Sequence, residues 1–199
     1  MKRFHVALAA GLLSATASAA MAQDHPAFFP QRDVTVTYAI SGLGKDGNGP
    51  TSVRVAVASG GTRARIEPDG LPGYMLMDRT DNRFTMVMAA QRIYMEMPGA
   101  MNRANEYMLN DSMHFVRKGH DRVAGYRCTN WDMTSPRMNA SGCITDDGVI
   151  LRGESQTQDG PVRILATSVS YAAVPDNLFR PPAGYQRMEI PAFGGFTRH

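Results

Sequence analysis

Long apolar runs are almost absent from this 199-residue sequence. The longest run lies at residues 6–13, far short of the roughly 20 apolar residues that a membrane-spanning helix needs. We therefore expect a chain that does not span a membrane. Basic runs are absent as well: the arginines are scattered singly, which argues against a nucleic-acid surface.

The N-terminus has the three-part layout of a secretory signal peptide. A basic stretch, Met1–His5, precedes the apolar run, and two small-x-small cleavage sites follow at Ala17–Ala19 and Ala20–Ala22. The second site is preferred because the polar Gln23 comes directly after it.

We therefore expect residues 1–22 to be a signal peptide. Residues 23–199 would form a single β-rich domain with a flexible tail from about residue 190, in the periplasm or secreted. Export would remove Lys2 and Arg3, leaving 19 of the 21 basic residues against 18 acidic ones. The mature chain is thus predicted to be almost neutral.

Cysteine is scarce too, with only Cys128 and Cys143 in the chain. In an oxidising compartment two cysteines most simply form one disulfide, and closing a loop of this length stabilises the fold by about 3 kcal/mol. A redox or metal-binding pair is the alternative, but the Cys-x-x-Cys spacing typical of such pairs is missing. Neither cysteine lies near the cleavage site, so lipid anchoring is not expected.

Strict alternation of apolar and polar residues is the dominant pattern. It predicts half-buried strands of an antiparallel sheet with one solvated face. These strands are expected at residues 34–40, 53–57, 62–66, 74–77, 83–88, 92–97, 114–118, 123–133, 142–145, 149–156 and 162–173. The fold class is therefore mainly β, with one or two helices.

Methionine is unusually frequent, with 14 in the chain, and gathers on three neighbouring strands. Each strand presents its large apolar side chains on one side: Met75 and Met77, then Phe84, Met86 and Met88, then Ile93, Met95 and Met97. Met101 and Met108 follow at helical spacing within residues 100–110. This predicts an amphipathic helix lying over the sheet as a lid.

Three interpretations of the methionines are open. Unbranched thioethers adapt to ligands of varied shape, so these residues would bind a hydrophobic small molecule or lipid acyl chain. Soft sulfur ligands also favour copper(I), and the spacing of Met95, Met97 and Met101 is similar to that of exported copper-handling proteins. The third interpretation is an ordinary core, with the protein acting as an envelope interaction module without a ligand.

Motifs for catalysis were not found. Gly44-Lys45 lies in a glycine-rich loop, but Asp46 replaces the Ser or Thr that a phosphate loop needs. His114 and His120 are the only internal histidines of the mature chain, and the spacing gives them no enforced catalytic partner except Asp121 beside His120. We expect a protein that is not an enzyme, with no cofactor and no resident metal.

Two segments, Val123–Cys128 and Val174–Tyr185, carry a resemblance to a known group. The chain resembles an uncharacterised family of exported bacterial proteins grouped with the lipoprotein-carrier superfamily typified by LolA and LolB. The resemblance implies a LolA-like fold, a curved antiparallel half-barrel closed by helices. It also implies that the concave face holds acyl chains, and it brings no catalytic residues.

Overall fold

The structure is a computed structural model that describes residues 25–44, 48–105, 108–157 and 160–189. The expected signal peptide, residues 1–22, and the expected tail from about residue 190 lie outside the described residues, as does Lys45 of the glycine-rich loop. No helix in the described ranges is long and apolar enough to cross a membrane.

Twelve strands form one sheet in the described part of the chain, in the order β12-β6-β5-β4-β3-β2-β1-β11-β10-β9-β8-β7. They are β1 (Val34–Ser41), β2 (Ser52–Val57), β3 (Arg63–Pro68), β4 (Gly73–Asp78), β5 (Arg83–Met88), β6 (Ile93–Glu96), β7 (His114–Val123), β8 (Tyr126–Ser135), β9 (Met138–Ile144), β10 (Ile150–Thr157), β11 (Gly160–Ser170) and β12 (Gln186–Arg187).

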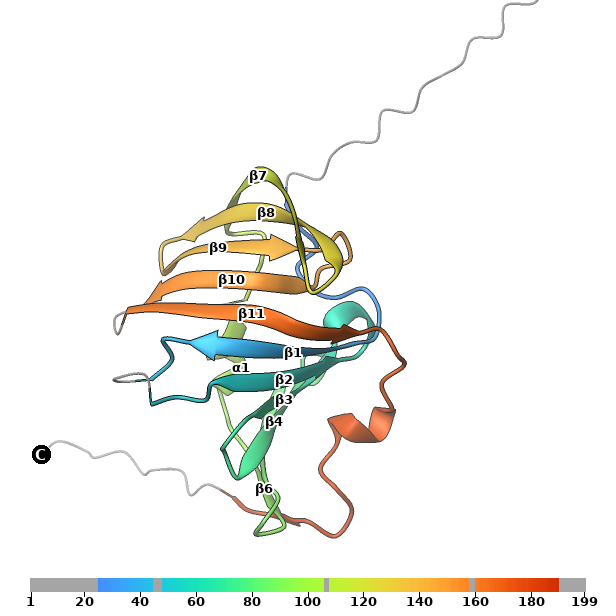
Figure 1. Cartoon of the computed structure of the whole chain (residues 1–199). Helices are drawn as coiled ribbons and strands as arrows, with labels where there is room; N and C mark the ends of the chain where they lie inside the picture. The colour runs from blue at the N-terminus through green and yellow to red at the C-terminus, as the bar shows by residue number, and fades with distance from the viewer. Residues whose placement is uncertain (1–24, 45–47, 106–107, 158–159, 190–199) are drawn as a thin grey trace, which may run out of the picture.

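Neighbouring strands are antiparallel throughout, except that β12 pairs with β6 in parallel. β12 and β7 are the two ends of the sheet, which therefore stays open. Figure 1 shows β7 to β11 turned against β3, β4 and β6, so that the sheet wraps around one side. The predicted fold class, a mainly β chain with a curved antiparallel half-barrel, is confirmed.

One predicted strand boundary is wrong. The alternation favoured a strand over residues 123–133, but Val123 ends β7 and a hairpin separates it from β8. Ala124 and Gly125 form the turn with positive φ angles of 48° and 83°. Such a two-residue turn matches the twist of paired strands, and the glycine makes the left-handed conformation easy.

The helix is shorter than the methionine spacing predicted. α1 spans Ala100–Asn105 and contacts β5, with Met101 buried in it. Met108 and Leu109 lie beyond it in irregular chain, where the Asn110 side chain donates a hydrogen bond to the Met108 carbonyl oxygen. Bonds of this kind between an asparagine side chain and the local backbone compete with helix formation.

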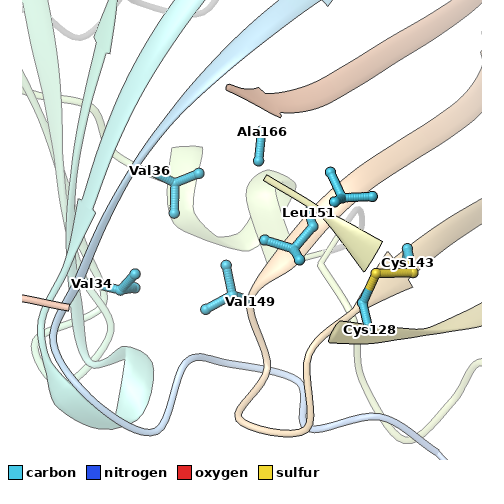
Figure 2. Close-up of a cluster of buried hydrophobic side chains, with 8 residues drawn as sticks. Val34, Val36, Cys128, Cys143, Val149, Leu151 and Ala166 are labelled. Atoms are coloured by element: carbon cyan, nitrogen blue, oxygen red, sulfur yellow. A yellow bond between two sulfur atoms is a disulfide. The ribbon is translucent and has the colours of Figure 1, made fainter. Parts of the chain in front are cut away.

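Part of the core lies where β1 faces the start of β10. Val34 and Val36 point toward Val149 and Leu151, as Figure 2 shows. All four side chains are almost completely buried. Since β1 and β10 are separated in the sheet by β11, this contact indicates that the sheet curves toward its Val34 face.

The predicted disulfide is confirmed. Cys128 of β8 and Cys143 of β9 are bonded, with their Cα atoms 5.3 Å apart, and both belong to the same buried cluster as Val34 and Leu151 (Figure 2). The bond therefore fastens two neighbouring strands beside the core.

The outer face of β4 and β5 is covered, although the alternation predicted a solvated face. Leu76 is 5% exposed and Val87 is 0% exposed, and Tyr185 packs against their cluster. Nearby, Phe179 of the 3-10 helix η3 (Asp176–Phe179) packs on Ala58 at the end of β2. The chain after β11, residues 171–189, thus crosses the outer face, where only a short turn near the sheet edge was expected.

Candidate functional site

The concave face forms an open cavity of about 450 Å³. Its wall is mostly apolar and comes from both halves of the sheet: Val53 and Ile66 lie on one side, Met133 and Ile164 on the other. Residues so distant in strand order line one cavity because the sheet curves around it.

The hydroxyl group of Tyr38, in this wall, has its hydrogen-bond partner within the protein. The Tyr38 hydroxyl donates a 2.9 Å hydrogen bond to the carbonyl oxygen of Ile150. Burial, with a smaller contribution from Tyr171, raises the pKa of Tyr38 well above its ordinary value. Tyr38 therefore stays neutral and presents its ring to the cavity.

The strand register places the eight predicted residues of β4, β5 and the β6 region on the same face as this cavity. Met77 lies opposite Ala64, a cavity residue, and also opposite Phe84. Met86 lies between Met75 and Met95. We call this surface the methionine face; its members are Met75, Met77, Phe84, Met86, Met88, Ile93, Met95 and Met97.

Every member of the methionine face is only half-buried. The opposite face of the same strands, with Tyr74, Leu76 and Val87, is buried under the C-terminal segment. In this part of the sheet the packed core therefore lies on the outside. The inner surface remains a contiguous apolar patch that water reaches.

The remaining predicted site residues have different positions. Met108 lines the cavity together with Met77, whereas Met101 is buried within α1. The other members of the methionine face lie beside the cavity and not in its wall.

Sequence reasoning missed several cavity-wall residues and one residue at the edge of the methionine face. Val53, Val55 and Val57 were recognised as one strand face but were given no binding role, although their alternation was the same signal. Met188 was also missed: it is 47% exposed, and its amide bonds the Tyr94 carbonyl oxygen at the open edge of the methionine face. No pattern in the sequence links Met188 to β6.

The N-terminal segment, residues 25–33, closes one end of the cavity. Phe28 and Phe29 both line it. The Phe28 ring lies 4.6 Å from the His25 ring and 5.7 Å from that of Phe115, while the Arg79 guanidinium stands 3.5 Å above the Phe29 ring.

Asp147 holds this segment in place. Its carboxylate accepts hydrogen bonds from Arg32 at 2.7 Å, from Tyr171 at 3.2 Å and from Thr145, while its carbonyl oxygen accepts from the Gln31 amide. Burial raises the pKa of Asp147, but the bonds from Thr145 and Arg32 and the Arg32 charge outweigh it and lower the pKa overall. Asp147 is therefore ionised at neutral pH. We call its bonds to Gln31 and Arg32 the latch of the N-terminal segment.

A larger hollow of about 610 Å³ lies on the opposite face of β8 to β11. Its charged side chains are engaged in ion pairs, Arg152 with Asp121 at 2.9 Å and Arg163 with Glu154 at 2.8 Å. Polar and charged side chains make up a larger share of its lining than of the concave cavity's.

Within the described ranges, the neighbours of one catalytic candidate, His120, are engaged in other contacts. His120 shares a 3.1 Å hydrogen bond with Thr129, and the neighbouring Asp121 is bonded to Arg152. Among the described residues no group of three or more His, Cys, Asp or Glu side chains could hold a metal ion.

Known proteins similar to this chain show its fold. An uncharacterized conserved protein from Thermus thermophilus superposes with a TM-score of 0.56 at 12% identity, covering 80% of this chain and 91% of that one. MucB superposes with a TM-score of 0.50 at 16% identity. The superposition covers 78% of this chain and 59% of MucB. A domain described as an outer membrane lipoprotein-sorting protein from Vibrio parahaemolyticus superposes with a TM-score of 0.42 at 8% identity. The superposition covers 77% of this chain and 91% of that domain.

The superpositions on the Thermus thermophilus protein and on MucB, together with the open curved sheet, show the class of fold, an open antiparallel half-barrel, as the resemblance of Val123–Cys128 and Val174–Tyr185 implied. Within the chain, residues 60–149 match a sequence family described as a domain of unknown function, DUF4412. This match includes β4, β5 and β6, and so the whole methionine face. A search of curated proteins by sequence finds no match.

Proposed function

We propose that this protein is an exported, non-enzymatic binding protein that holds a hydrophobic ligand, such as a lipid acyl chain, on the methionine face and in the adjoining cavity. Residues 1–22 act as its signal peptide, and residues 23–199 form one domain. The Cys128–Cys143 disulfide supports export, because such bonds persist in oxidising compartments.

The observation that carries the proposal is the contrast between the two faces of β4 and β5. Val87 on the outer face is completely buried, while Met75 and Met86 on the inner face are only half-buried. A contiguous apolar surface that water still reaches usually marks a place where something binds. The adaptable thioether side chains suit a flexible apolar partner.

The size of the site agrees with an acyl chain. A cavity of about 450 Å³ falls within the usual range for small-molecule sites. Burying about ten methylene groups would contribute roughly 8 kcal/mol before ordering costs are subtracted. Micromolar affinity is then within reach without a polar contact.

The direct test is native mass spectrometry, with lipid extraction, of the protein purified from its own envelope. The variant Met86→Arg/Met95→Arg places charge on the methionine face and should lose the bound lipid. Leu165→Arg is the matched control, since Leu165 is exposed on the opposite face. Lipid carried equally by all three proteins, or by none, would contradict the proposal.

A second measurement, combined with the lipid analysis, separates the alternatives. Copper(I) handling would need thioether ligands such as Met95, Met97 and Met101, and titration of copper(I) against a chelator measures it directly. Tight stoichiometric uptake without lipid would favour copper. A protein that carries neither lipid nor copper would favour a ligand-free interaction module.

A further inference from the structure

The methionines in the described ranges fall into two groups by exposure. Those on the methionine face are half-buried, as are Met108 and Met138 in the cavity wall, and Met188 is exposed. In contrast, Met101, Met113 and Met133 are 2%, 7% and 4% exposed. Oxidation of a thioether requires that the oxidant reach the sulfur, so the two groups should react at different rates.

We infer that the methionine face is a modification site, where hydrogen peroxide converts thioethers to sulfoxides and thereby closes the site to apolar ligands. The closing step rests on the proposed function. The modification itself follows from exposure and placement alone.

The register makes this face sensitive to a single oxidation. Met75, Met86 and Met95 are consecutive cross-strand neighbours on β4, β5 and β6. Side chains opposite each other in this way start from Cβ atoms only about 5 Å apart. A sulfoxide at Met86 therefore places its dipole beside two further thioethers.

Sulfoxide formation needs no reactant besides the thioether and the peroxide. The sulfur lone pair attacks one peroxide oxygen, the O–O bond breaks, and the second oxygen leaves as water after protonation. The sulfur loses two electrons, the peroxide gains two, and a sulfoxide remains. Its oxygen accepts hydrogen bonds, and covering it with an acyl chain leaves that acceptor without a partner, which is costly.

This gives methionine a role that other strand residues could not fill. Val and Ile have the higher β-propensity, and leucine would offer a similar volume, but none of them is oxidised by peroxide under the same conditions. A face built from methionine is apolar when reduced and polar when oxidised.

The test combines stepwise hydrogen peroxide treatment of the intact protein, peptide mass spectrometry, and titration with dansyl-undecanoate after the oxidant is removed. Sulfoxides should form on the methionine face and at Met188 well before Met101, Met113 and Met133. Affinity for the probe should then fall by about tenfold or more. Equal oxidation rates in both groups would overturn the inference, as would unchanged affinity of the fully oxidised face.

Two variants sharpen the result. Each is compared with itself before and after the same oxidant dose, so its starting affinity does not enter. Met75→Leu/Met86→Leu/Met95→Leu should lose much less affinity than the wild type, whereas Met113→Leu, outside the face, should lose as much as the wild type. If both variants lost affinity equally, the inference would be wrong. If the reduced protein binds no probe, the closing step fails with the proposed function, and the oxidation pattern alone decides the modification site.

Discussion

At the scale of single residues, two glycines determine how the N-terminal segment fits. A Cβ atom at Gly61 would lie 2.3 Å from the Phe29 Cβ, and one at Gly148 would lie 2.4 Å from the Phe29 carbonyl oxygen. Both glycines also have positive φ, at 65° and 89°. Phe29 can close the cavity only because these two positions carry no side chain.

Gly61→Ala is therefore expected to destabilise the protein more than Gly60→Ala. Both substitutions strain a positive φ, but a Cβ at Gly60 meets nothing within 4 Å. The difference isolates the clash with Phe29 and should be about 1–3 kcal/mol in the free energy of unfolding. Urea denaturation of the two variants measures it, and equal losses would show that Phe29 moves away without cost.

At the scale of elements, the latch of the N-terminal segment should depend on pH. The pKa of Asp147 is lowered in the folded state. The bonds that its ionised carboxylate makes therefore stabilise the fold above pH 3.8, the ordinary pKa of this group. That contribution is lost as the pH falls through the lower, folded-state pKa. The stability difference between the wild type and Asp147→Asn should thus be present at neutral pH and shrink in acid.

Thermal unfolding of both proteins across this pH range provides the measurement. At low pH the protonated Asp147 resembles the asparagine, so the two curves should converge. A difference that stayed constant from neutral to acid pH would mean that the charge on Asp147 contributes nothing.

The C-terminal segment is expected to contribute strongly to stability through its contacts with the outer face. Phe179 is buried against Ala58, and the Arg63 guanidinium lies 5.0 Å from its ring. Phe179→Ala should cost about 3–5 kcal/mol, while Phe179→Leu, which keeps most of the buried apolar volume, should cost less. Equal costs, measured by urea denaturation, would contradict this assignment.

The strands were predictable from alternation because one face of each is more apolar than the other, as in Val34, Val36 and Tyr38. The hairpin at Ala124–Gly125 was not, because the turn carries no Asn or Asp and the residues on either side of it, Val123 and Tyr126, are apolar. The short α1 was overestimated for a similar reason: spacing shows which face is apolar, but the competition from Asn110 depends on local hydrogen bonds.

At the scale of the whole molecule, the sequence located the methionine face but not the surface that completes it. Cross-strand register follows from the pattern of each hairpin, so Met75, Met86 and Met95 could be grouped in advance. The return of the chain over the outer face is a long-range contact without a local signal. Without it, the face bearing Leu76 and Val87 had to be taken as solvated, and the asymmetry that exposes the methionines was not visible.

The central claim is that the methionine face binds an apolar ligand, and methyl-labelled methionine gives the most direct view of it. Titrating the reduced, [methyl-¹³C]methionine protein with a fatty acid should shift the signals of Met75, Met86 and Met95 most, and those of Met77 and Met108 as the cavity fills. Met113, buried and outside the face, should change least. Saturating fatty acid that left the methionine-face signals unmoved, or that moved Met113 most, would contradict the account.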